Sequence, residues 1–196
     1  MKGIDTVKQG KSQLLKFIRE KIMREAMDIN NTRPIDKIVK DTLREAGNRK
    51  WDFNEFIVMG TWKPKKKNLC NNRFMKRMRE RNERIPDPGE QFSYIVVKGP
   101  RLRDEKGRLI PYRVGDYMEY PSNIGKEQNM KIDINYYLGT TVAMCARFIN
   151  ENDSYQPHPS HKIMQIKDPD LREKKIDKYS QDEAVRQLKK YIKTLQ

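Results

Sequence analysis

The sequence predicts an α+β fold that is mainly helical and carries a small antiparallel β element. Three observations lead to this class. Apolar residues recur at spacings of three and four in several segments, as they do along one face of a helix. Residues 133–150 are nearly all apolar, so they should form the most buried helix. The stretch PDPGEQFSYIVVKG, residues 86–99, indicates a proline–glycine turn that leads into an apolar strand.

Two helices are predicted before residue 50. Residues 10–29 and 35–46 each keep an apolar stripe, and Gly47 is a natural terminator of the second helix. The stripes consist of Leu14, Ile18, Ile22 and Ile29 in the first helix and of Ile35, Ile38, Val39, Leu43 and Ala46 in the second. The next stretch, WDFNEFIVMGTW at 51–62, fits either a short helix or a strand that ends at Gly60.

A strongly basic helix is predicted over residues 63–85. Residues 61–84 contain ten basic and two acidic side chains, so their net charge of +8 is more than half of the chain's +15. Phe74, Met78 and Ile85 form a thin apolar stripe along this helix. The basic side chains expected to stand clear of the stripe include Lys76, Arg77 and Arg81.

The remaining segments complete the predicted fold. Residues 99–116 should form a basic loop or hairpin, so that the β element lies around 92–98 and 109–118. The proline-rich segment 151–168 should be weakly ordered, and a last amphipathic helix should span 180–195. This helix starts at a capping box, Ser-Gln-Asp-Glu, and its stripe consists of Ala184, Leu188, Tyr191 and Leu195.

The composition indicates an anionic partner. The net charge of +15 and the pI near 9.7 favour nucleic acid first and an acidic membrane surface second. The apolar runs exclude a wholly disordered basic tail, and none is long enough to span a membrane. Because the first ten residues contain no apolar signal region, we expect an intracellular protein without a membrane partner. Cys70 and Cys145 belong to no CxxC pair and should be free thiols in a reducing compartment.

The sequence offers no catalytic constellation. His158 and His161 form an H-x-x-H pair in the proline-rich loop, but no carboxylate or cysteine follows at a spacing that would complete a metal site. Asp87 follows a proline as in metal-dependent nucleases, which also need a Glu-x-Lys or Asp-x-Lys on the next strand. That strand reads Val96-Val97-Lys98, so the nuclease site would lack one ligand. We therefore assign no catalytic and no metal-binding residue.

The basic run favours phosphate binding over a merely solvated face, because it has one sign and contains Phe74 and Met78. Such contacts position a duplex without reading its bases, and no helix-turn-helix, zinc-finger or RRM pattern is visible, so binding should be independent of sequence. The candidate DNA-binding residues are Lys2, Lys8, Lys11, Lys65, Lys66, Lys67, Arg73, Lys76, Arg77, Arg81, Lys98, Arg101 and Arg103.

Three short motifs follow one another along the chain. They are Lys2-Gly3-Ile4-Asp5, then Pro88-Gly89-Glu90 with Tyr94 and Ile95, then Ile132-Asp133 with Tyr136 and Tyr137. In this order and spacing they resemble the C-terminal part of a family B DNA polymerase, with Gln91 in the place of the family's usual arginine. Lys8-Gln9-Gly10, where most cellular members carry Arg-Arg-Asp, and CARFINEN at 145–152 resemble the polymerases of large cytoplasmic DNA viruses.

The resemblance implies a single thumb-like domain over residues 1–196. A helical opening segment, 1–60, would be followed by the basic helix, strand and hairpin, 61–118, and by a helical C-terminal part, 119–196. In the family the thumb grips the primer–template duplex during DNA replication. The implied partners are thus duplex primer–template DNA and the palm and exonuclease portion of the polymerase, on the same or a separate chain.

The resemblance also implies which chemistry lies elsewhere. The family's catalytic aspartate motifs belong to the palm, and none of them occurs in this sequence. This chain would therefore be part of a DNA-directed DNA polymerase, a nucleotidyltransferase, yet be inactive alone. It would bind no cofactor, because Mg²⁺ belongs to the palm of the complete polymerase. A viral polymerase of this kind would act in the host cytoplasm.

Two other interpretations stay open. The chain could be a free-standing basic protein that binds nucleic acid independently of sequence. It could also be a metal-dependent nuclease, which the missing Glu-x-Lys disfavours. The genomic neighbourhood would distinguish the free-standing protein from a polymerase thumb. An upstream reading frame that ends shortly after a Tyr-Gly-Asp-Thr-Asp motif would indicate a polymerase.

Overall fold

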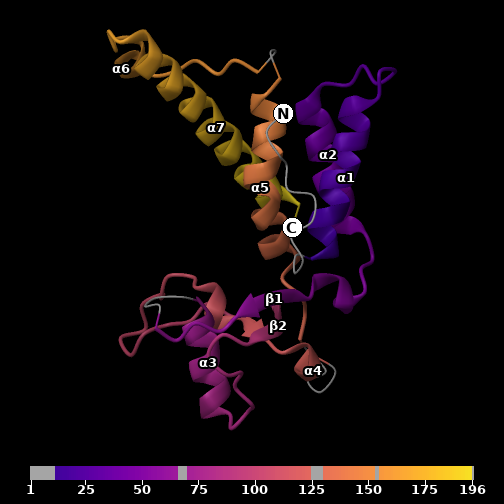
Figure 1. The fold of residues 1–196 in the computed structure, drawn as a ribbon, viewed down its shortest axis with the longest axis vertical. Coiled ribbons are helices and arrows are strands. Elements are labelled where there is room, and N and C mark those ends of the chain that lie inside the picture. Colours follow the sequence, from indigo (N-terminus) through magenta and orange to yellow (C-terminus); the bar gives the residue numbers. More distant parts are fainter. Residues whose placement is uncertain (1–11, 66–69, 125–129, 153–154, 196) are drawn as a thin grey trace. The chain divides into compact units, whose positions relative to one another are not determined.

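The computed structural model describes residues 12–65, 70–124, 130–152 and 155–195 (Figure 1). These residues form two compact units. The helix unit consists of residues 14–50 and 134–195, and the sheet unit consists of residues 12–13 and 51–133. Two of the three predicted segments, 1–60 and 119–196, are each divided between the units.

The helix unit begins with α1, Gln13–Met27, and α2, Ile35–Asn48. Both predicted helices are confirmed, and the stripe residues Leu14, Ile18 and Ile22 have no exposed surface. The expected place of Ile29 in this stripe is wrong: α1 ends at Met27, and Ile29 is 96% exposed in the turn that follows. Gly47 does not terminate α2, which continues to Asn48.

Helix α5, Ile134–Asn150, forms the centre of the helix unit. It packs against both α2 and α7, a helix that begins at Pro169. The prediction of a deeply buried helix is confirmed. Its buried residues are Tyr137, Leu138, Thr141, Val142, Cys145, Ala146 and Ile149. The Thr141 hydroxyl donates to the Leu138 carbonyl oxygen at 2.7 Å, so this polar side chain is satisfied within the helix.

The last helix is longer than predicted. Helix α7 spans Pro169–Thr194, and the short helix α6, His161–Met164, precedes it within the segment expected to be weakly ordered. The N-cap is Asp168, whose carboxylate accepts from the Leu171 N–H at 3.1 Å, and proline occupies the first turn. The predicted capping box is wrong, because Ser180 lies buried inside the helix.

The apolar stripe of α7 also differs from the prediction at its end. Ala184 and Leu188 are buried as expected, but the stripe continues through Ile192. Tyr191 and Leu195 are only half-buried. The Tyr191 hydroxyl instead donates to the Lys40 carbonyl oxygen at 3.1 Å, which ties α7 to α2.

The sheet unit contains a three-stranded antiparallel sheet of order β1-β2-β3. The elements along the chain are η1 (Phe53–Phe56), β1 (Val58–Thr61), α3 (Cys70–Glu80), β2 (Gln91–Val96), η2 (Val114–Asp116), β3 (Met118–Glu119) and α4 (Pro121–Ile124). The ambiguous stretch at 51–62 therefore contains both a short helix and a strand. Strand β2 is confirmed, and it pairs with β1 from Val58↔Tyr94 to Thr61↔Gln91.

The second half of the predicted β element is mostly wrong. Only Met118 and Glu119 pair with β2, whereas Leu109 pairs with Arg103 inside a local hairpin. Pro111 has no N–H to donate to a longer ladder, which limits the strand at this point. Gly107, with φ of 76°, makes the hairpin turn.

The basic helix is shorter than its sequence pattern. Helix α3 covers residues 70–80 instead of 63–85. Phe74 and Met78 are fully buried as predicted, but Ile85 lies beyond the end of the helix. The chain leaves the helix at Asn82, which adopts a positive φ of 56°, while the Glu83 N–H donates to the Met78 carbonyl oxygen at 2.9 Å.

The variant Leu138→Ala should lose about 2–5 kcal/mol of unfolding free energy, because Leu138 is only 1% exposed and its loss leaves a cavity in the helix unit. Urea unfolding followed by circular dichroism measures the change. Arg147→Ala, on the exposed face of the same helix, is the matched control and should change little. A Leu138→Ala protein as stable as this control would contradict the buried position of α5.

The thiol of Cys145 should be unreactive in the folded protein. Burial raises its pKa from 9.0 to about 12, and the hydroxyl of Thr141 opposes this rise only partly. Iodoacetamide at pH 8 should therefore modify Cys145 only after denaturation, as peptide mass mapping would show. The unfolded chain ionises this thiol from about pH 9, so stability should fall as the pH rises from 9 towards 12. Rapid labelling of Cys145 in the native protein would contradict this.

Candidate nucleic-acid interface

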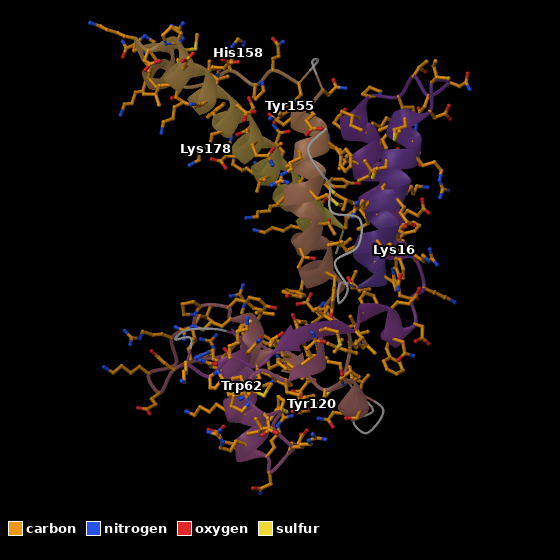
Figure 2. All side chains as sticks on the ribbon, in the orientation of Figure 1. Lys16, Trp62, Tyr120, Tyr155, His158 and Lys178 are labelled. Atoms are coloured by element: carbon orange, nitrogen blue, oxygen red, sulfur yellow. The ribbon has the colours of Figure 1, made fainter. Side chains whose placement is uncertain are left out.

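Helix α3 packs its apolar side onto the sheet. Phe74, Met75 and Met78 have no exposed surface. The Phe74 ring stacks on Phe92 of β2 with centroids 5.8 Å apart, and meets Tyr120 edge-on at 4.9 Å. Figure 2 shows Tyr120 beside α3, and its hydroxyl donates to the Arg84 carbonyl oxygen at 2.9 Å. The apolar contacts thus fix which face of α3 points away from the sheet.

A buried carboxylate holds α3 against β3. The side chain of Glu119 is only 3% exposed. Its Oε1 accepts from Arg77 at 3.0 Å, and its Oε2 accepts from Arg81 at 3.0 Å. Arg77 also donates to the Met118 carbonyl oxygen. One carboxylate therefore binds both Arg77 of α3 and Arg81, which follows the last residue of the helix.

The other end of α3 is held by a close backbone approach. A Cβ atom on Gly115 would lie 2.2 Å from the Cys70 carbonyl oxygen, so only glycine fits where η2 meets the first turn of α3. The next residue, Asp116, forms an ion pair with Arg73, with Oδ1 and Nε 3.3 Å apart. Residues 115–119 therefore fix α3 at both ends.

The predicted DNA-binding residues of α3 divide into two groups. Lys76 is 78% exposed at its side chain and forms only a loose pair with Glu80, at 3.8 Å. Arg73, Arg77 and Arg81 hold acidic partners within the protein. The expectation that Arg77 stands clear of the packed side is wrong, because its side chain is only 24% exposed and points to Glu119.

Two features of this surface were not among the predicted contacts. Arg79 and Arg84 are exposed, and the Arg84 side chain is 86% exposed with its nearest carboxylate, on Glu90, 3.5 Å away. The role of Glu119 was also missed. Its only signal in the sequence is an acidic residue within the aromatic run Tyr-Met-Glu-Tyr. Among the described residues near α3, Lys76, Arg79 and Arg84 thus present the most accessible positive charge.

The remaining predicted contacts lie on loops of the sheet unit or outside the described residues. Lys65, Lys98, Arg101 and Arg103 are all exposed. Arg103 donates to the Gly107 carbonyl oxygen at 2.6 Å, within its own hairpin. The candidates Lys2, Lys8, Lys11, Lys66 and Lys67 lie outside the described residues, as do the first motif and Lys8-Gln9-Gly10.

A cavity of about 730 Å³ lies beside the C-terminal end of α3. Its walls include Met59, Arg81, Glu83, Arg84, Glu90 and Asn123. The charges here are already paired: Glu83 accepts from Asn123 at 2.9 Å and Glu90 lies 3.5 Å from Arg84. The cavity therefore offers no excess of one charge to a ligand.

The described residues contain no cluster of three or more histidine, cysteine or acidic side chains that could hold a metal ion. His158 and His161 are both exposed, and His158 lies on the connection from α5 to α6 (Figure 2). Within the same described ranges, no helix is long and apolar enough to cross a bilayer.

Comparison with known proteins identifies the family of this chain. The family described as DNA polymerase family B matches residues 1–151, more than half of the chain. The chain belongs to DNA polymerase family B. It is 36% identical over 215 residues to the DNA polymerase beta of African swine fever virus from a Namibian warthog isolate. It is 35% identical over 218 residues to the same polymerase of a Kenyan pig isolate.

Both relatives align with all of this chain but are much longer. The chain spans 17% of the length of each. The resemblance to polymerases of large cytoplasmic DNA viruses, drawn from the motifs, is thereby confirmed. The chain therefore corresponds to one part of these longer polymerases.

Replacing Glu119 by alanine should cost about 1–3 kcal/mol, because the partly buried Arg77 and the half-exposed Arg81 would lose their shared carboxylate. Thermal and urea unfolding measure the loss. Glu80→Ala is the control, since its exposed pair with Lys76 should contribute about 0–1 kcal/mol. Combining Glu119→Ala with Arg77→Met and Arg81→Met should recover much of the stability. Equal stability of Glu119→Ala and Glu80→Ala would contradict this role.

Proposed function

We propose that this chain is the thumb portion of a DNA-directed DNA polymerase and that it grips the primer–template duplex. The proposal rests on one observation: the outer face of α3 is basic and exposed. The chain that carries this helix belongs to DNA polymerase family B. That face carries accessible cations on a helix whose opposite side is fully buried. The sequence resemblance to the C-terminal part of the family supports the assignment to the thumb.

The geometry suits contact with a phosphate backbone. Lysine and arginine neutralise phosphates and release counterions, which yields affinity without base recognition. Asp116 and Glu119 pair with Arg73, Arg77 and Arg81, whereas the pairs of Lys76 with Glu80 and of Arg84 with Glu90 are loose and exposed. Arg81 is 42% exposed while it contacts Glu119, so it can share its guanidinium with a phosphate.

The proposed role is to hold DNA and not to transfer the phosphoryl group. No catalytic carboxylate pair is assigned to this chain, so nucleotide addition would need the palm of the complete polymerase. Loss of phosphate contacts should then speed dissociation, since interface changes act mostly on the dissociation rate. A free-standing nucleic-acid-binding protein would show the same DNA affinity but would have no effect on the product length of a polymerase.

The double variant Lys76→Ala, Arg79→Ala tests the contact. Fluorescence anisotropy with a duplex of unrelated sequences should give a wild-type log–log salt slope of roughly −4 to −5, for about four to six neutralised phosphates. The double variant should flatten this slope by about 1–2 and weaken binding at moderate salt. Lys189→Ala, Lys193→Ala on exposed positions of α7 removes the same charge and is the matched control.

Three outcomes would count against the proposal. A salt-independent affinity would exclude phosphate contacts, and preference for one defined sequence would exclude a general grip. Equal losses in the α3 and α7 variants would assign the binding to net charge and not to α3. In the complete polymerase, the α3 variant should shorten products per binding event while single-nucleotide incorporation on preformed complexes stays near normal.

A further inference from the structure

Strand β2 is paired on its two sides over different lengths. Its first four residues, Gln91 to Tyr94, pair with β1, whereas only its last two pair with β3. Main-chain N–H and C=O groups point alternately to the two sides of a strand. The Val97 N–H donates to the carbonyl oxygen of Tyr117, which directly precedes β3, at 2.9 Å, so the main-chain groups of odd-numbered residues face the side of β3. Those of Gln91 and Ser93 therefore point to this side, past the end of β3.

The end of β3 leaves this side of β2 open. If the register of Ile95 with Glu119 continued, Ser93 would lie opposite Pro121. Proline has no N–H to donate to the Ser93 carbonyl oxygen, and α4 begins at this proline, so the chain leaves the strand direction here. Among the described residues, no main-chain hydrogen bond reaches this side of Gln91 or Ser93. These two residues thus form an unpaired strand edge.

The cavity of about 730 Å³ beside α3 opens onto this edge. Its lining includes three residues of β2 and three from the segment in which β3 gives way to α4, namely Gln91, Phe92, Ser93, Tyr120, Ser122 and Asn123. The volume lies within the range of about 300–1,000 Å³ that is common for binding sites. Space is therefore available where a further strand would pair with β2.

The lining of the cavity favours an uncharged occupant. Its acidic and basic side chains already have partners within the protein, so a charged group would meet both signs at once. The hydroxyls of Ser93 and Ser122 hold no hydrogen bond within the described part of the chain. Met59, which is 44% exposed, adds apolar surface. An extended peptide supplies N–H and C=O groups for the strand edge and an apolar side chain for Met59.

We infer that the open edge of β2 is a docking site for an extended, uncharged segment of the polymerase outside these 196 residues, which adds to the sheet beside Gln91 and Ser93. Open strand edges pair readily with other chains, and proteins normally cover them. This chain spans only 17% of the length of its relatives, so most of the polypeptide that can cover the edge lies outside it. DNA fits this place less well, because its phosphates would approach Glu83 and Glu90. The inference rests on the proposed place of this chain in a polymerase and adds a contact that joins it to the rest.

The first test follows single amides by hydrogen exchange with mass spectrometry and electron-transfer fragmentation. It compares the 196-residue chain with the complete polymerase. The N–H groups of Gln91 and Ser93 should exchange freely in the chain alone. In the complete polymerase they should exchange roughly tenfold more slowly, because they donate to the added segment. Phe92 and Tyr94 are the internal controls: their N–H groups point to β1 and should be protected in both proteins.

Photo-cross-linking in the complete polymerase identifies the occupant. Ser122→p-benzoylphenylalanine places the reactive group in the cavity wall, and peptide mapping gives the segment that it reaches. In this background, Ser93→Pro removes the N–H on the open side and should lower the cross-link yield roughly fivefold. Ser93→Ala retains this N–H and is the matched control. Because Ser93→Pro could disturb folding, Gln91→Pro serves as a second variant, since proline is tolerated as the first residue of a strand.

A cross-link to a segment outside residues 1–196 that both proline variants weaken would support the docking site. Equal exchange of Gln91 and Ser93 in the chain and in the complete polymerase would overturn it. A cross-link only within residues 1–196, to a second copy of the chain or to added duplex DNA would do the same.

The outcomes also separate this inference from the duplex grip. Anisotropy with the 196-residue chain should give the proline variants the same affinity for blunt duplex DNA as the wild type. Normal duplex binding without protection of Gln91 and Ser93 in the complete polymerase overturns the docking site alone. Protection together with an external cross-link, but without duplex binding, overturns the grip and leaves the docking site supported.

Discussion

The arrangement of the sheet unit depends on the buried carboxylate of Glu119. Its two oxygens accept from Arg77 of α3 and from Arg81 just beyond the end of this helix. Removing the carboxylate would leave two unpaired arginines, which costs free energy. Apolar contacts of Phe74 and Met78 define the buried face of α3 but would tolerate small rotations of the helix. The directional bonds to Glu119 select one rotation, and this choice determines which cations face outward.

The same constraint explains how a protein with this much positive charge keeps a packed helix in its most basic region. Arg73, Arg77 and Arg81 are paired within the sheet unit with Asp116 and Glu119. Lys76, Arg79 and Arg84 remain for solvent and for a polyanion. A count of charges along the sequence cannot separate these two groups, because they alternate within residues 73–84.

The helices of this protein could be predicted largely from residue spacing, because Leu14, Ile18 and the buried face of α5 follow a helical period. The long α7 could not, since its first three turns bury almost nothing and are defined by the Asp168 cap. The motifs predicted the family, and the basic run marked the candidate interface. The partners of Arg77 and Arg81 could not be predicted, because Glu119 lies some forty residues further along the chain and meets them only through the sheet.

The order of the two units along the chain has a consequence for how the protein folds. The sheet unit is nearly one continuous run, 51–133, whereas the helix unit joins residues 14–50 to residues 134–195. During synthesis the sheet unit can therefore assemble while half of the helix unit's core has not yet been made. The face of α2 that packs on α5 must wait unpaired until α5 emerges. The contact of α5 with α2 joins segments on either side of the sheet unit, and contacts between segments so far apart in the sequence form more slowly than local ones.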